Sequence, residues 1–331
     1  MFGFKTIKTT RVGPTYGKLP KGCNLCGKGS KLVLFATGLC DFNCFYCPIS
    51  KVRKGADTAF ANERPIGNVD DLLDEAHQMR ALGAGVTGGD PLKSKQTFEF
   101  IKTLKENFNQ NFHIHLYTKT TTPKFLKLAY DAGVDEIRFH WSDPTPALDF
   151  DWEVGAEVPA IPGEFQKLCD YLGSLNSLGV KFVNLNELEF SDSNFETLRS
   201  HDLEHIDSDD ESIGVKGSEP LAKKMVEWAK DQGMSTSVHY CSAQTKLFTQ
   251  LVSRYKRTAK NIAQSFETVT REGTILVGEV PNTPENKDKL KQFEEYGEWL
   301  RTNLKNAEKL GGRVVEYWPT FDKRIIEITN L

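Results

Sequence analysis

Apolar residues recur every three or four positions along five segments between residues 68 and 233, which is the period of an amphipathic helix. The first segment begins at Asn68, a residue type that favours the helix N-cap. It carries Leu72, Ala76 and Met79 on one face before Gly83 ends it. The same reasoning predicts further helices at 94–108, 122–133, 165–179 and 218–233.

Short β-rich runs alternate with these helices. Six strands are predicted, at 31–36, 85–87, 112–118, 136–141, 181–185 and 235–240. Regular alternation of strands and helices implies parallel strands in one sheet. The fold class is therefore α/β, either an open doubly wound sheet or a partial barrel, and in both the loops at the carboxyl ends of the strands make the active site.

Two long loops interrupt the alternation, at 141–163 and 186–220. The acidic composition of the second predicts a solvated, mobile surface, and a lid is the alternative. The alternation stops after residue 243. A long helix through Leu247 and Phe266, short strands at 274–280 and 313–318, a charged helix at 284–306 and a strand at 324–328 predict a small α+β appendage. We therefore expect an N-terminal segment (1–30), a core (31–242) and a C-terminal region (243–331).

The composition fits a folded protein: 331 residues, 39% hydrophobic, with a formal net charge of −3. That charge argues against a dedicated nucleic-acid binder. No apolar run approaches the ~18 residues that span a bilayer, and the N-terminus lacks the apolar stretch of a signal peptide. A cytoplasmic location is therefore expected. Because that compartment is reducing, the seven cysteines are not expected to form a disulfide framework. Five of them lie between residues 23 and 47, which favours a metal.

Cys40, Cys44 and Cys47 follow the first predicted strand with the spacing C-x3-C-x2-C. Three thiolates in one tight loop can hold three irons of a [4Fe–4S] cluster, which normally takes four cysteines. The fourth iron then lacks a protein ligand and is open to a small molecule, as a catalytic zinc is.

This cysteine run, with Tyr46 before its third cysteine, resembles the cluster motif of the radical S-adenosylmethionine (SAM) superfamily. Thr87-Gly88-Gly89-Asp90-Pro91 is similar to the Gly-Gly-Glu motif of that family, with Asp in place of Glu. The resemblance implies a partial (β/α)6 TIM-like barrel over residues 31–241, a [4Fe–4S] cluster and SAM. It also implies that one electron cleaves SAM to a 5′-deoxyadenosyl radical, which takes a hydrogen from a substrate.

The resemblance further implies roles for individual residues. Gly88, Gly89 and Asp90 would hold the methionyl amino group, and Tyr46 would contact adenine. The implied partners are a low-potential electron donor such as ferredoxin or flavodoxin, and a substrate that the sequence does not identify. By position at strand ends, His140, Asn186 and Glu187 are further candidates for SAM contacts, as are Lys119, Arg138 and Asn184. The alternative for each is a turn-former or a hydrogen bonder at the barrel mouth.

A second cysteine pair, Cys23 and Cys26, forms a C-x2-C knuckle. Cys241, at the end of the sixth predicted strand, could join it, with His239 as a further ligand, to hold a second iron–sulfur cluster or a zinc ion. The alternative is a knuckle without a partner. Cys169 lies on an apolar helix face and is expected to be a core thiol.

Within the superfamily, the sequence resembles uncharacterised proteins related to pyruvate formate-lyase activating enzymes. The extra knuckle and an appendage without cysteine depart from those activases, which argues against installation of a glycyl radical. Two other functions compete with a radical SAM enzyme. One is a non-catalytic zinc-binding module that stabilises a nucleic-acid or protein contact, and the other is a simple electron carrier.

Overall fold

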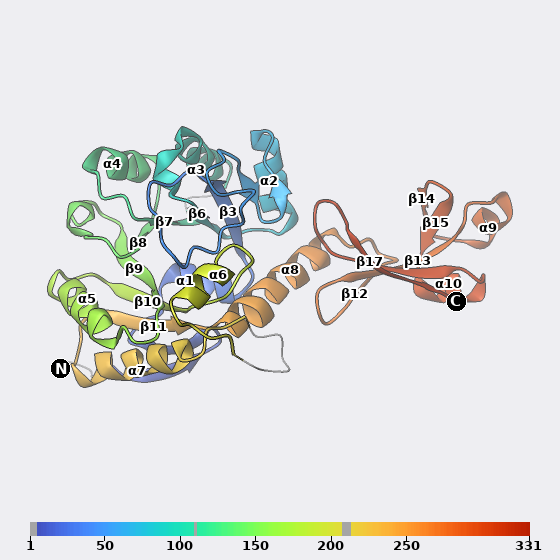
Figure 1. Ribbon diagram of the computed structural model, residues 1–331. Helices are drawn as coiled ribbons and strands as arrows, with labels where there is room; N and C mark the ends of the chain where they lie inside the picture. Colours follow the sequence, from blue (N-terminus) through green and yellow to red (C-terminus); the bar gives the residue numbers. More distant parts are fainter. Residues whose placement is uncertain (1–4, 109–110, 207–212) are drawn as a thin grey trace.

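The computed structural model describes residues 5–108, 111–206 and 213–331, which form two sheets connected by one long helix (Figure 1). The larger sheet has eleven strands and curves around a central space, with its first and last strands unpaired to each other. The smaller sheet has six strands and lies to one side. No helix of the described chain combines the length and the apolar composition that crossing a membrane requires.

Seven parallel strands form the wall of the larger sheet, in the order β3-β6-β7-β8-β9-β10-β11 read from one end. Six of them match the six predicted strands. The seven are β3 Lys31–Thr37, β6 Gly83–Gly88, β7 His113–Thr118, β8 Glu136–Phe139, β9 Glu153–Ala160, β10 Phe182–Glu187 and β11 Ser237–Cys241.

The prediction of a loop over 141–163 is wrong, because β9 lies there between β8 and β10 and pairs with both in parallel. Its sequence, EVGAEVPA, mixes two acids, a glycine and a proline with the apolar residues, and these residue types are depleted in strands. Tertiary packing overrides that preference. At Gly155, for example, an added Cβ would lie 2.2 Å from the ring of Phe182. Only the short helix η2 Thr145–Ala147 intervenes between β8 and β9.

Helices cover the outer face of this sheet, as predicted from their apolar stripes (Figure 1). They are α2 Val69–Gln78, α3 Lys95–Asn107, α4 Pro123–Ala132, α5 Phe165–Ser177 and α7 Ser218–Asp231, with the one-turn helix η1 Pro91–Lys93 between β6 and α3. Asn68 caps α2 by accepting from the backbone N–H groups of Asp70 and Asp71. Gly133 ends α4 in the left-handed conformation, with φ of 106°.

The N-terminal segment belongs to the same sheet rather than standing apart from it. β1 Ile7–Thr10 and β2 Gly13–Tyr16 form a hairpin, and β2 pairs antiparallel with β11. β4 Phe60–Ala61 and β5 Arg64–Pro65 extend the opposite end beyond β3. The helix α1 Lys21–Gly27 lies within the curve of the sheet, against β6 and β7.

The acidic segment 186–220 is not simply a solvated surface, as its composition predicted. Its short helix α6 Phe195–Ser200 contributes to an apolar cluster that packs on Phe45 and Tyr46 of the cysteine loop. Asn194 donates a hydrogen bond to the carbonyl oxygen of Tyr46 at 3.0 Å. Part of this segment therefore packs on the cysteine loop. Residues 207–212 lie outside the described residues.

The helix after residue 243 begins as a π-helix, Thr245–Leu251, and continues as α8 Val252–Ile262. It leads into the smaller sheet, which contains β12 Thr268–Val269, β13 Ile275–Pro281, β14 Glu294–Tyr296, β15 Trp299–Thr302, β16 Arg313–Tyr317 and β17 Ile325–Asn330. The predicted helix over 284–306 is wrong. Two short helices, α9 Pro284–Lys289 and α10 Leu304–Lys309, flank a hairpin that turns at Gly297, with φ of 59°. The division of the chain at residues 30 and 242 stays a prediction.

Candidate functional site

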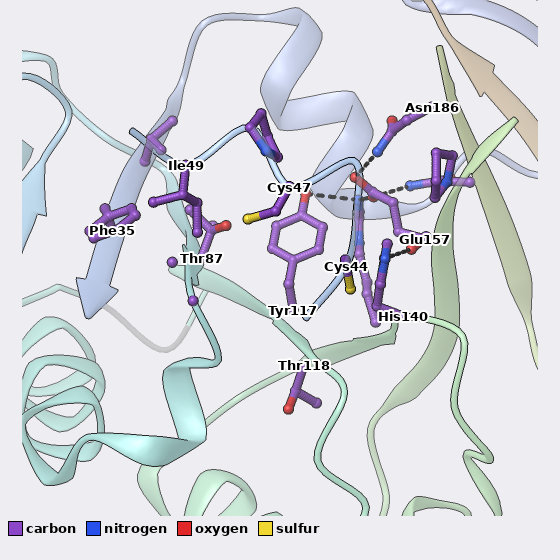
Figure 2. Close-up of a pocket in the computed structure, with 18 of the residues that line it drawn as sticks. Phe35, Cys44, Cys47, Ile49, Thr87, Tyr117, Thr118, His140, Glu157 and Asn186 are labelled. Carbon is purple, nitrogen blue, oxygen red and sulfur yellow. Dashed lines mark hydrogen bonds and ion pairs between the residues drawn. The ribbon is translucent and has the colours of Figure 1, made fainter. Parts of the chain in front are cut away.

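A cavity of about 530 Å³ opens at the carboxyl ends of the parallel strands. Cys40, Cys44 and Cys47 line it, as do the backbone of Gly88 and Gly89 and the side chains of Tyr46 and His140. Figure 2 shows Cys44 and Cys47 facing the same space as His140, Glu157 and Asn186. The structure thus brings most of the predicted site residues together.

The cysteine loop is held by backbone hydrogen bonds rather than by secondary structure. The Cys47 N–H donates to the Cys44 carbonyl at 3.1 Å, and the Gly38 N–H donates to the Ala56 carbonyl at 2.8 Å. Cys40 is exposed, whereas Cys44 and Cys47 are half-buried, and partial burial raises the pKa of the Cys40 thiol.

The thiols of this loop fit a [4Fe–4S] cluster because they come from one short loop and all line the cavity. Within the described residues, no three His, Cys, Asp or Glu side chains are arranged closely enough to hold a metal ion. The three thiols would therefore turn toward a cluster as it binds. A fourth iron would then face the cavity, where a small molecule can reach it.

Gly88 and Gly89 lie against the start of the cysteine loop. The Gly89 N–H donates to the Thr37 carbonyl at 2.8 Å, and the Asp90 N–H donates to the Leu39 carbonyl at 2.7 Å. A Cβ on Gly88 would lie 2.2 Å from the Thr37 oxygen, and the φ of Gly88 is +145°. Only glycine allows this approach, which leaves the backbone of both residues at the cavity wall.

The carboxylate of Asp90 is buried and accepts hydrogen bonds from other residues of the protein. It accepts hydrogen bonds from the hydroxyls of Thr118 (2.7 Å) and Thr120 (2.8 Å) and from the backbone N–H groups of Leu92, Lys119 and Thr120. It connects the end of β6 to the end of β7. This geometry favours a positioning role and does not support the predicted contact of the carboxylate with a ligand in the cavity.

Tyr46 and His140 form a hydrogen-bonded pair at the cavity wall. The two side chains meet at 2.8 Å, Tyr46 Oη to His140 Nε2, and His140 Nδ1 lies 2.8 Å from the Glu157 backbone oxygen. Burial lowers the pKa of His140, so the ring is neutral near pH 7. The carbonyl can only accept, so Nδ1 carries the proton and the Tyr46 hydroxyl donates to Nε2.

Glu157 lies at the centre of a buried polar network that the sequence reasoning missed, because its strand was predicted as a loop. Its carboxylate accepts from Arg138 (2.6 Å), Asn184 (2.9 Å) and Asn186 (2.8 Å), as Figure 2 shows in part. Burial alone would raise the pKa of Glu157. The Arg138 charge and the two amides outweigh burial and bring that pKa to about 2.

The remaining predicted residues lie at the rim or below it. Glu187 lines the cavity and accepts from the Ala243 backbone N–H at 2.8 Å, and burial raises its pKa. Lys119 lies with its ammonium 5.1 Å from the centre of the Phe42 ring. Lys31, on β3, contacts His115 Nε2 at 2.7 Å in the lower cavity and was also missed.

A parallel α/β barrel with a three-cysteine loop at the end of its first parallel strand defines a class of iron–sulfur enzymes, and comparison with known proteins identifies the family. Residues 34–156 match the model of the radical SAM superfamily. A protein of Methanocaldococcus jannaschii is 37% identical over 303 residues, which cover 85% of this chain and 78% of that protein. Its name proposes it as a glycyl-radical enzyme activating enzyme. The chain belongs to the radical SAM superfamily.

Solved structures that this chain matches include those of Streptococcus suis SuiB. The SAM-bound form covers 64% of this chain at 7% identity, with a TM-score of 0.42. The form bound to the precursor peptide SuiA covers 66% of this chain at 7% identity, with a TM-score of 0.45. The matched part of this chain spans about half the length of SuiB (50% and 51%).

Family membership confirms the central expectations from the sequence. The protein is a radical SAM enzyme that uses a [4Fe–4S] cluster and SAM, a reductant and a substrate. The predicted relation to activating enzymes is confirmed by the named relative. The zinc-module and electron-carrier alternatives are therefore set aside. The assignment of individual ligands stays a prediction.

Proposed function

We propose that Cys40, Cys44 and Cys47 hold the [4Fe–4S] cluster and that SAM binds between this loop and the Gly88–Gly89 backbone. The observation that carries the proposal is the packing of the two motifs against each other at the mouth of one cavity. When bound, the cluster and SAM supply a 5′-deoxyadenosyl radical that removes a hydrogen atom from a substrate.

The chain's own residues orient the bound groups. The Gly88–Gly89 backbone can approach the methionyl end of SAM because it carries no side chain there. Asp90 fixes that backbone through its bonds to β7. Tyr46 presents its ring toward adenine, with its hydroxyl held by neutral His140. Asn186 and Glu187, at the end of β10, face the ribose and methionine region.

The substrate occupies the lower cavity in this proposal, beside Glu157 and Arg138. These two side chains are already paired and hydrogen-bonded, so they form a preorganised polar wall at low reorganisation cost. A substrate with a polar group toward this wall would place its C–H toward the adenosyl end of bound SAM. The covering by segment 186–220 excludes water from the radical.

A ferredoxin or flavodoxin is the proposed electron donor. The loop that follows the cysteines exposes Lys51, Lys54 and Val52, and Val52 is 88% exposed. A basic rim around an apolar side chain suits a transient contact with an acidic carrier. Cytoplasmic location, where such carriers and reduced thiols occur, is part of the same proposal.

Glycyl-radical installation on a partner enzyme is the second candidate, because the relative's name proposes that role. It requires that a polypeptide loop enter the cavity. Incubation with a candidate partner would give a glycyl-radical doublet in the electron paramagnetic resonance (EPR) spectrum, which hydrogen abstraction from a small molecule would not.

Anaerobic reconstitution with iron, sulfide and SAM tests the proposal. With dithionite, the wild-type protein should form 5′-deoxyadenosine, and Cys44→Ala should lose this product. Cys169→Ala is the matched control, because Cys169 is a buried core thiol on α5 and does not line the cavity. Full 5′-deoxyadenosine formation by Cys44→Ala would refute the proposed cluster ligands.

A further inference from the structure

Three cysteines outside the C-x3-C-x2-C loop line the part of the cavity between α1 and the end of β11, which we call its floor. Within the described residues these thiols are not grouped closely enough to hold an ion, so they would turn toward a cluster as it binds. Cys23 and Cys26 lie on α1, and Cys241 ends β11, more than 200 residues later in the chain. All three line the same cavity as Cys40, Cys44 and Cys47. The position of α1 within the curve of the sheet places Cys23 and Cys26 at this cavity, although α1 precedes the first parallel strand.

One amide side chain connects two of these thiols. The Cys26 thiol lies 2.9 Å from Gln250 Oε1, and the Gln250 amide nitrogen lies 3.3 Å from Cys241 Sγ. Cys23 and Cys26 are three residues apart on one helix and so lie on the same face. Gln250 belongs to the π-helix Thr245–Leu251, a rare geometry that is common at functional sites.

Two hydrogen-bond donors are directed at the sulfur of Cys23. Asn184 Nδ2 lies 3.2 Å and Arg138 Nη2 lies 3.5 Å from Cys23 Sγ, so both donors point at the thiol. Lys31, in the same part of the cavity, adds a second positive charge. Donors directed at sulfur are the means by which proteins stabilise and tune iron–sulfur clusters.

His239 offers a nitrogen on the same face of β11 as Cys241, two residues away. Asn184 and Asn186, which line the cavity, stand beside His239 and Cys241 in the parallel register, so all four face inward. The His239 ring is buried, with Nδ1 2.9 Å from the Thr15 hydroxyl and 3.3 Å from the Pro14 carbonyl. Within the described chain Nε2 has no partner. Metal-bound histidines commonly show this pattern.

We propose that Cys23, Cys26 and Cys241 hold a second iron–sulfur cluster, of the [4Fe–4S] type, at the floor of the reaction cavity. The fourth iron takes His239 Nε2 or faces the substrate. Zinc fits less well, because structural zinc sites are closed, whereas these thiols open onto the cavity. This site does not depend on the ligands proposed for the SAM cluster.

The glycine before the first thiol shows how closely α1 fits the barrel. A Cβ at Gly22 would lie 2.3 Å from His115 Nδ1 and 2.6 Å from Arg138 Nη2. The Gly22 N–H also donates to Glu136 at 3.1 Å. The helix is therefore held in register against the charged network, and this contact places Cys23 beside Arg138 and Asn184.

Metal analysis of three reconstituted full-length variants tests the second cluster. Wild type should contain about eight irons and eight sulfides per chain, as two [4Fe–4S] clusters require. The triple variant Cys40→Ala, Cys44→Ala, Cys47→Ala should keep about four irons and form no 5′-deoxyadenosine. The triple variant Cys23→Ser, Cys26→Ser, Cys241→Ser should also keep about four irons, with the SAM-dependent change of its EPR signal retained. Cys169→Ala should match wild type.

Three results would overturn the second cluster: about four irons in wild type, loss of all iron from the Cys40, Cys44, Cys47 variant, or stoichiometric zinc that only the Cys23, Cys26, Cys241 variant lacks. The iron content of the Cys40, Cys44, Cys47 variant is measured with Cys23, Cys26 and Cys241 intact. Misfolding of the Cys23, Cys26, Cys241 variant therefore does not affect that result. Wild type with eight irons and no 5′-deoxyadenosine would contradict the proposed function and leave the second cluster supported.

Discussion

Asp90 is the residue whose role the structure changes most. The resemblance implied that its carboxylate binds a methionyl amine, yet both oxygens are occupied by donors from β7 and the following turn. The carboxylate closes the turn after β6 and holds Gly88 and Gly89 in place. The presence of Asp rather than the longer Glu at this position is thus explained by the hydrogen bonds of its carboxylate to Thr118 and Thr120.

Asp90→Asn should destabilise the protein strongly. The amide replaces one acceptor oxygen with a donor that faces other donors, and hydrogen bonds to a buried charge contribute about 1.5–3 kcal/mol each. We expect the free energy of unfolding of the cluster-free protein to fall by about 2–3 kcal/mol, measured by urea denaturation. Asp41→Asn, which removes only the exposed pair with Lys93, should cost less than about 1 kcal/mol. Equal losses would contradict this role.

Buried ionisable groups predict loss of stability in acid. Burial lowers the pKa of His113 to about 4. As the pH falls below 6.5, the pKa of this side chain in the unfolded chain, the unfolded state therefore binds the proton first. Stability falls from about pH 6.5 toward pH 4 for this reason, by about 3 kcal/mol. Glu157, whose pKa is about 2, adds stability above its unfolded value of 4.5 that is lost toward pH 2.

His113→Gln should flatten the fall between pH 6.5 and 4 in a series of denaturation curves, whatever it does to absolute stability. His77→Gln, at an exposed position on α2, is the matched control and should leave the slope as in wild type. An unchanged slope in His113→Gln would show that this ring is not the group that titrates.

At the residue scale, sequence reasoning found the groups that a motif encodes and missed those that only the fold assembles. Cys40, Cys44 and Cys47 lie within eight consecutive residues of one loop, so their spacing identifies them. Glu157 and Lys31 lie in unremarkable local sequence. Their roles follow from Arg138 and His115, which other strands bring close.

Among the elements, α1 is the one on which the cavity floor depends. Gly22→Ala should displace it, because the added Cβ would overlap His115 and Arg138 side chains. Overpacking of this kind typically costs about 1–3 kcal/mol. The displaced helix should also expose Cys23, so maleimide labelling of Cys23 in the cluster-free protein should become faster.

Gly173→Ala is the control for the same substitution in a helix. Nothing lies within 4 Å of a Cβ at Gly173 on α5, so the change should stabilise the helix by about 0.5–1 kcal/mol. Slow Cys23 labelling in Gly22→Ala, with unchanged stability, would mean that the helix adjusts without leaving the floor.

Element prediction succeeded where the local pattern and the tertiary context agree. The helix α4, with an apolar stripe and a glycine at its end, was predicted within one residue at each end. The start of α2 at the cap Asn68 was also predicted, but α2 ends at Gln78 and the predicted stop, Gly83, begins β6. Element prediction failed at β9, where the acidic residues and the proline are typical of a loop. It also failed over 284–306, where a single helix was predicted. There the charged residues favour a helix, but Gly297 allows a hairpin that the smaller sheet pairs.

For the whole molecule, the question is how the smaller sheet is attached to the barrel. The helix that carries Gln250 at the cavity floor continues into α8, which packs on the end of α2. Arg257 donates to the carbonyl oxygens of Met79 (2.8 Å) and Arg80 (2.7 Å), and Asn261 donates to that of Gln78 (2.6 Å). These side chains satisfy carbonyls that the end of a helix leaves free.

The double variant Arg257→Ala, Asn261→Ala should therefore loosen the attachment at both ends. Loss of these bonds, at about 1 kcal/mol each, should raise hydrogen exchange in the last turn of α2 and in α8 by roughly tenfold or more. Because the same helix carries Gln250, exchange should also rise in the π-helix at the cavity floor. Lys260→Ala, at an exposed position on α8, should leave all three regions as in wild type. Faster exchange confined to α2 would show that the appendage and the floor are not mechanically connected.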